Sequence, residues 1–407
     1  MSRDARLLFA ARAIRMFGYG AVAVILVLYL AALDFNGFQI GLLLSLTLAG
    51  DTLISLWLTT RADRVGRRKV LVIGALLMAG AGAVFGVAGA FSVLVLAATV
   101  GVISPSGNEV GPFLAVEQAS LSQTLPGSKR TSVFAWYNLV GSVATAVGAL
   151  VAGLVVGTLR DRGFADVNAY RVIVAGYAGL GLAMAALFEL VSPLVEARPE
   201  DAGDPSIRRR LGLHRSRSIV TRLAALFSVD ALAGGLVMQS LLAYWFHVRF
   251  GVPEATLGAI FFGANLLAAA SALAAARIAS RIGLINTMVF THLPSNVLLI
   301  AVPLMPSLEL AVIVLLARFS ISQMDVPTRQ SYTMAVVDPD ERSAAAGVTG
   351  IARSIGAAIG SAIAGPLVAV PALAALPFFV GGGLKIVYDL ALWRAFRARP
   401  APEDPRG

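Results

Sequence analysis

Residues 38–89 read FQIGLLLSLTLAGDTLISLWLTTRADRVGRRKVLVIGALLMAGAGAVFGVAG. Two apolar runs, 38–59 and 69–89, flank a short loop that is rich in arginine. About 20 apolar residues in an α-helix cross the hydrocarbon of a bilayer, and each run has that length. The stretch therefore predicts two membrane-spanning helices joined by a basic loop.

Apolar runs of this kind recur through the whole chain. Of its 407 residues, 57% are hydrophobic and 14% are charged, and the mean hydropathy is +0.80. Because a soluble domain carries about 25% charged residues, we expect this chain to be dissolved in lipid. The first run is too long for a signal peptide and is expected to stay as a span. The predicted spans are 7–33, 38–59, 69–89, 92–122, 131–158, 169–195, 219–248, 255–276, 284–304, 307–336, 341–370 and 373–396. The fold class is thus an all-α polytopic membrane protein with twelve transmembrane helices.

Basic residues set the expected orientation, because they gather on the cytoplasmic side of membrane proteins. Here they cluster in alternate connections and at both ends, which predicts two cytoplasmic termini and a place in the cell (plasma or inner) membrane. The net charge of +10 follows from this pattern, so the expected partner is the lipid bilayer and not nucleic acid. The inner segments hold Arg3, Arg6, Arg61, Arg64, Arg67, Arg68, Lys69, Lys129, Arg130, the arginines of 198–222, Arg277, Arg281, Arg342, Arg394, Arg397, Arg399 and Arg406. The outer segments hold Arg160, Arg162, Arg171 and Arg249.

The two halves of the chain resemble each other. A shift of 212 residues places Gly148 on Gly360, and a shift of 215 places Gly20 on Gly235. With the polar stretch at the midpoint, this predicts two six-helix halves around a central cavity. The expected division is 1–195 for the first half, 196–218 for a cytoplasmic linker, 219–397 for the second half and 398–407 for a tail.

The residue inventory argues against several function classes. There is no cysteine, and the three histidines are isolated, so we expect no metal and no cofactor. An enzyme would need a cluster of acid, base or metal-binding side chains, which the sequence does not offer. An ATP-driven pump would need a glycine-rich phosphate loop. We therefore expect neither an enzyme nor a pump.

The loop between the second and third spans resembles the signature loop of the major facilitator superfamily. The matching residues are Asp63, Arg64, Gly66, Arg67 and Arg68, whereas the leading glycine of the motif is replaced by Thr59. The resemblance covers essentially the whole chain and implies a secondary transporter that works by alternating access on a small-molecule substrate. It also implies that this loop closes the cytoplasmic side.

A physical basis for such a gating loop exists. Asp63 could accept backbone N–H bonds at the helix that begins near 339–342, because the amino end of a helix favours an anion. The alternative is that the arginines only fix the topology.

The resemblance also carries expectations about direction and assembly. Resemblance to efflux members suggests proton-coupled export, although the fifth span lacks the glycine–proline pair of drug antiporters and Gly365-Pro366 lies in the eleventh span instead. The alternative is a proton-coupled uptake symporter. Members of the superfamily often act as monomers, and the same is expected here by analogy.

Charged residues inside spans are costly and usually functional. In the superfamily the first, fourth, seventh and tenth helices line the cavity, which implies cavity or proton-coupling roles for Arg15, Glu109, Asp230 and Arg318. Arg15 takes the place of Asp230 under the 215 shift. Asp230 could therefore alternate between an arginine partner and a proton, or form a permanent ion pair.

Arg318 has two candidate roles, either binding an anionic substrate or pairing with Glu109. Asp51, flanked by Thr47 and Ser55, forms a polar stripe on the second span that faces the cavity or packs between helices. Pro105 and Pro112 should break the fourth span and leave Glu109 in the broken segment.

Further charges are expected nearer the ends of spans. Asp325 and Arg329 are spaced i, i+4 and should pair, with a kink at Pro327 between them. They are expected to form an inner gate together with Glu117. Lys385 and Asp389 have the same spacing and are expected to pair with each other, whereas His292 and Asn296 are interpreted as packing residues.

Overall fold

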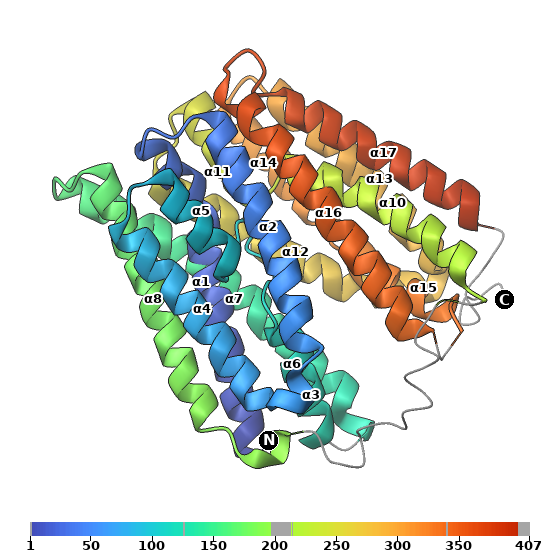
Figure 1. The fold of residues 1–407 in the computed structure, drawn as a ribbon. Coiled ribbons are helices and arrows are strands. Elements are labelled where there is room, and N and C mark those ends of the chain that lie inside the picture. The colour runs from blue at the N-terminus through green and yellow to red at the C-terminus, as the bar shows by residue number, and fades with distance from the viewer. Residues whose placement is uncertain (1, 125–126, 197–212, 214, 339–340, 398–407) are drawn as a thin grey trace. The chain divides into compact units, whose positions relative to one another are not determined.

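The computed structural model describes residues 2–124, 127–196, 213, 215–338 and 341–397, and the regular structure in these ranges is helical (Figure 1). Within them, ten helices are long and apolar enough to cross a membrane. Large apolar side chains such as Leu53 and Val87 point outward, with 69% and 81% of their surface exposed. Such surfaces suit lipid, so the chain is a multi-pass membrane protein. The count of twelve spans stays a prediction.

The first of two compact units comprises residues 1–202 and 238–262. Its helices are α1 (Arg3–Ala32), α2 (Gly37–Thr59), α3 (Ala62–Val65), α4 (Arg67–Val87), α5 (Phe91–Val100), α6 (Phe113–Thr124), α7 (Gly127–Asp161), α8 (Asp166–Glu189), η1 (Pro193–Val195), α11 (Gln239–Phe250) and the beginning of α12 (Glu254–Ile282). In this unit α1 packs against α7, α8 and α11, and α4 packs against α8.

The second unit comprises residues 203–237 and 263–407. Its helices are α10 (Arg217–Leu236), the remainder of α12, α13 (Leu284–Ala301), η3 (Val302–Leu304), α14 (Leu308–Phe319), α15 (Asp325–Ala335), α16 (Arg342–Ala369) and α17 (Leu376–Phe396). Here α10 packs against α16 and α17, and α13 packs against α17 (Figure 1).

Three of the predicted spans are interrupted. The span 92–122 consists of α5 and α6 with a non-helical segment, 101–112, between them. The span 307–336 consists of α14 and α15, and its break lies at 320–324. The third interruption separates α10 from α11 at residues 237–238. Prolines explain the first break, because they cannot continue a helix hydrogen-bond ladder. The second break was expected at Pro327 and lies before it instead, so that Pro327 sits in the first turn of α15.

Two helix crossings depend on glycine. A Cβ on Gly148 would lie 1.9 Å from the carbonyl oxygen of Phe17, where α7 crosses α1. A Cβ on Gly360 would lie 2.1 Å from the carbonyl oxygen of Leu232, where α16 crosses α10. The 212 shift relates these two glycines, and the expectation that they allow close helix contact is confirmed.

Candidate functional site

The first candidate cluster joins α1 to the broken helix α5/α6. The carboxylate of Glu109 accepts hydrogen bonds from Arg12 and from Arg15 Nε, the latter at 2.7 Å. The two Nη atoms of Arg15 donate to both oxygens of Glu117, at 2.8 and 2.7 Å, and Tyr137 also donates to Glu117. Arg15 and Glu117 are fully buried. Two arginines therefore balance two carboxylates in a network that is almost closed to solvent.

The break between α5 and α6 places Glu109 beside α1. Gly107 and Gly111 adopt φ angles of +72° and +81°, which glycine accepts without a steric penalty. The carboxylate of Asp51 accepts the Gly111 N–H at 2.6 Å and the Ser55 hydroxyl at 3.2 Å. Asp51 on α2 thus helps to hold the broken segment in place. The sequence did not reveal this role of Asp51.

Hydroxyl groups satisfy the carbonyls that the break releases. Tyr177 donates to Val102 O at 2.6 Å, and Tyr19 donates to Val110 O at 3.0 Å. A backbone carbonyl without a partner would be costly at this depth. These hydrogen bonds therefore hold the non-helical segment in a defined conformation, and they fix the position of Glu109.

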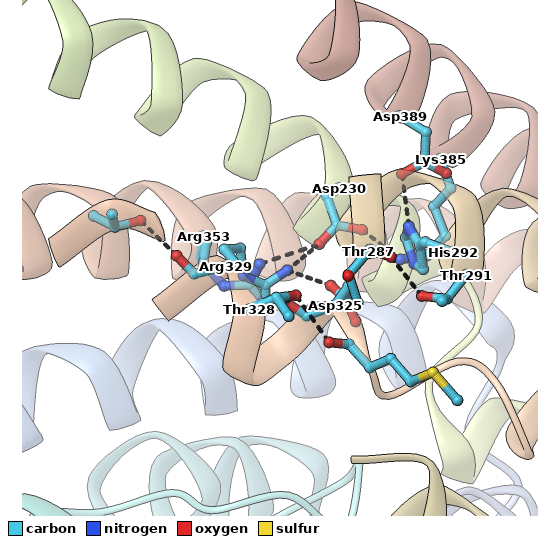
Figure 2. Close-up of polar contacts among 12 residues, drawn as sticks. Asp230, Thr287, Thr291, His292, Asp325, Thr328, Arg329, Arg353, Lys385 and Asp389 are labelled. Atoms are coloured by element: carbon cyan, nitrogen blue, oxygen red, sulfur yellow. Dashed lines mark hydrogen bonds and ion pairs between the residues drawn. The ribbon is translucent and has the colours of Figure 1, made fainter. Parts of the chain in front are cut away.

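The second candidate cluster surrounds Asp230 on α10 (Figure 2). Lys385 Nζ lies 2.6 Å from Asp230 Oδ1, while Arg329 and Arg353 each lie 3.1 Å from Oδ2. Asp230 is 4% exposed. One buried carboxylate thus meets cations from α15, α16 and α17.

Arg329 connects Asp230 to a second carboxylate. Its Nη1 lies 2.8 Å from Asp325 Oδ2 on the same helix, so the predicted i, i+4 pair is confirmed. The guanidinium also lies over the ring of Phe227, 5.5 Å from its centroid. Arg329 therefore ties α15 to α10 in this unit.

The predicted pair between Lys385 and Asp389 is wrong. Lys385 binds Asp230, whereas Asp389 lies 2.9 Å from His292 Nδ1 and accepts a 2.9 Å hydrogen bond from Asn296. His292 and Asn296 are one turn apart on α13 and face α17 through these bonds (Figure 2 shows His292 and Asp389). They are polar partners and not simple packing residues. The i, i+4 spacing of this polar pair was the signal that could have revealed them.

Two other expected pairings also differ. The partners of Glu109 are Arg12 and Arg15 rather than Arg318. Under the 215 shift Arg15 is equivalent to Asp230 and has the opposite charge. Its ion-pair partners are Glu109 and Glu117. Glu117, predicted at the inner gate, shares this network. Each of these ion pairs therefore lies within one of the two units.

The signature loop forms α3 and the start of α4. Gly66 adopts a φ of +107°, and Glu196 accepts the backbone N–H groups of Arg67 at 2.6 Å and Arg68 at 3.2 Å. Arg68 also pairs with Glu189 at 2.9 Å. A carboxylate at a helix amino end is favourable, so Glu196 caps α4. The expected contact of Asp63 with residues near 339–342 lies outside the described residues.

Comparisons with known proteins agree with this architecture. A family model described as Major Facilitator Superfamily matches residues 8–361. The chain is 30% identical over 419 residues to the uncharacterized membrane protein YJR124C of Saccharomyces cerevisiae, covering 96% of this chain and 93% of that protein. Among solved structures, a mutant of the nucleoside transporter NupG superposes with a TM-score of 0.79 at 15% identity, covering 97% of this chain and 100% of that one. A D-xylose–proton symporter gives 0.74 at 14% identity, covering 98% of both chains. Because the family model matches most of the chain, the chain belongs to the major facilitator superfamily.

Proposed function

We propose that the protein is a secondary active transporter that exports a small organic molecule in exchange for protons, by alternating access. In this proposal the halves are 1–195 and 219–397, both termini are cytoplasmic, and the protein acts as a monomer in the cell membrane. It catalyses no chemical reaction on its substrate. The proton, the substrate and the lipid bilayer are its partners.

The observation that carries the proposal is the set of three cations around Asp230. Lys385, Arg329 and Arg353 all lie within 3.1 Å of this buried carboxylate. A proton on Asp230 would remove the negative charge that these cations share. Uncompensated buried charges are unstable, so protonation would favour a different arrangement of α10, α15, α16 and α17. Such a link between proton and conformation is what coupling requires.

The cluster of the first unit offers a second proton acceptor. The side chain of Glu109 is 15% exposed, whereas that of Glu117 is completely buried. Glu109 is therefore the more accessible carboxylate, and the two arginines of α1 hold it when it is ionised. We assign it a role in the cavity, with Asp51 positioning its segment.

The remaining charged residues serve as gates in this proposal. The loop residues Asp63, Arg64, Gly66, Arg67 and Arg68 would close the cytoplasmic side, and Glu117, Asp325 and Arg329 would form the inner gate. The cap that Glu196 provides to α4 supports this role, because it gives the loop a defined shape.

Proton movement in sealed everted vesicles with an acid lumen tests the proposal. Small cations, anions and zwitterions are added one at a time to vesicles with wild-type protein or Asp230→Asn. We expect one class of compound to release protons from the lumen of wild-type vesicles and not of mutant vesicles. Release that persists in Asp230→Asn would reduce Asp230 to a structural partner.

Right-side-out vesicles address the opposite direction. Uptake coupled to inward proton flow there, without a response in everted vesicles, would replace export by symport. The D-xylose–proton symporter shares this fold, which makes symport the second candidate. Lack of any response in either orientation would contradict proton coupling.

A further inference from the structure

Arg318 is a buried cation with no carboxylate of the described residues in contact, and Asp325, which acts on it electrostatically, is paired with Arg329. It occupies the last turn of α14, has 9% of its surface exposed, and its Nε has no hydrogen-bond acceptor. In the part of the chain that the structure describes, no carboxylate lies within ion-pair distance of it. The ring of Phe319 lies 5.0 Å from its guanidinium carbon. A buried guanidinium in a membrane protein normally has an ionic partner or faces a cavity.

Other buried cations of the same unit have the carboxylate partners that Arg318 lacks. Arg329 has two carboxylate partners, and Arg353 and Lys385 each have one. The carboxylates of this cluster are already committed to these cations. Among these buried cations of the described chain, Arg318 is therefore the one without a carboxylate in ion-pair contact.

The chain next to Arg318 carries a second unsatisfied donor. Ser322 lies in the break at 320–324, is 4% exposed, and its hydroxyl has no partner. The N–H of Gln323 donates to Ser271 Oγ at 3.2 Å, which anchors the break to α12. Buried donors without acceptors are unfavourable unless something else accepts from them. The carboxyl end of α14 offsets only a small part of this cost for Arg318.

We propose that Arg318 binds the anionic group of the transported molecule, so that the cargo is a small organic anion bearing a carboxylate or a phosphate. A guanidinium presents paired N–H donors that match the oxygens of either group. The Ser322 hydroxyl supplies a further donor. The sequence left Glu109 as an alternative partner, and Glu109 is held by Arg12 and Arg15. This assignment of the substrate class rests on the proposed transport function.

Ligand binding to the full-length protein in detergent tests the assignment without requiring transport. The probes are benzoate, nicotinate and phenyl phosphate, each compared with its neutral counterpart benzamide, nicotinamide or phenol. We expect at least one anion to raise the melting temperature of the wild-type protein, whereas its neutral counterpart does not. Arg318→Gln should abolish this shift. Arg281→Gln, which removes an exposed arginine of the same unit, should keep it.

Several outcomes would overturn the assignment. They are no stabilisation by any anion, equal stabilisation by the neutral counterpart, and an unchanged shift in Arg318→Gln. If Arg318→Gln does not fold, as judged by circular dichroism, Arg318→Lys decides the question. Lysine keeps the charge but lacks the paired donors, so we expect Arg318→Lys to bind the anion roughly tenfold more weakly. An unchanged affinity would contradict the assignment. A failure of proton coupling in vesicles would leave this binding result intact, so the two proposals fail separately.

Discussion

Arg15 shows how a buried charge is stabilised in this protein. None of its side chain is exposed, and its three nitrogens bond Glu109 and Glu117. The ring of Phe113 lies 4.6 Å from its guanidinium carbon. Because each nitrogen of this fork meets a carboxylate oxygen, the penalty for burying the charge is offset only while both carboxylates remain.

Removing one of these carboxylates should therefore destabilise the fold. We expect Glu117→Gln to lower the free energy of unfolding by about 3–5 kcal/mol, because it leaves Arg15 partly unpaired in a buried site. The matched control is Glu189→Gln, whose ion pair with Arg68 has side chains 57% and 36% exposed and should cost less than about 1 kcal/mol. Thermal unfolding in detergent, followed by tryptophan fluorescence, measures both. Equal losses in the two variants would show that burial does not control the strength of these pairs.

At the scale of residues, the sequence predicted pairs that are local and missed those that are not. Asp325 and Arg329 meet because a single helix brings positions i and i+4 together. Lys385 and Asp389 have the same spacing, yet each has a partner on another helix. Spacing along one helix shows which residues can meet, whereas the partner that wins depends on neighbouring helices that a single sequence does not specify.

At the scale of elements, the interrupted helices were only partly predictable. Pro105 and Pro112 indicate the break in the fourth span directly, because each removes a backbone donor. The break at 320–324 contains no proline or glycine, and it lies before Pro327. The hydroxyl of Ser271, far away in sequence, accepts the N–H of Gln323 there, which is tertiary information.

The glycine crossings give a prediction at this scale. We expect Gly360→Ala to destabilise the protein by about 1–3 kcal/mol, because the added methyl group would meet the backbone of Leu232 and force α16 away from α10. Gly347 on the same helix has open space around it, so Gly347→Ala should be neutral or slightly stabilising. Melting temperatures of the two variants provide the test. A loss in Gly347→Ala as large as in Gly360→Ala would show that the contact with the Leu232 backbone is not the cause.

At the scale of the whole molecule, an ionic network ties the end of α7 to the start of α12. Arg160 Nη1 lies 2.7 Å from Glu254, which is 1% exposed, and Tyr170 donates to the same carboxylate at 2.6 Å. Arg160 also pairs with Asp166 at 2.8 Å. These contacts join a helix of the predicted first half to one of the predicted second half.

If transport proceeds by alternating access, this network must open in each cycle. Because the chain has no cysteine, Arg160→Cys with Glu254→Cys creates a single reactive pair. We expect a reversible thiol cross-linker to abolish proton-coupled flux in vesicles, and reduction to restore it. The control pair is Asp4→Cys with Ser192→Cys, two residues joined by a 3.0 Å hydrogen bond inside the first half. Full flux in protein that is cross-linked between positions 160 and 254 would show that α7 and α12 do not need to separate during transport.

The membrane class and the positions of most spans were predictable at this scale, because hydropathy is a local property. For the two buried clusters, the sequence predicted which spans carry charged residues but not which of these residues pair. Arg12 belongs to the first cluster as firmly as Arg15, and Asp389 pairs with His292, yet no periodicity distinguishes which of these charges meet.

The glycine crossings also limit which sequences can keep this fold. Gly20 and Gly148 meet the backbone of α7 and α1, and Gly235 and Gly360 meet the backbone of α16 and α10. Every other amino acid would add a Cβ at these positions, so a complete mutational scan should find every replacement there destabilising. These four glycines are therefore among the positions where the sequence is least free to change.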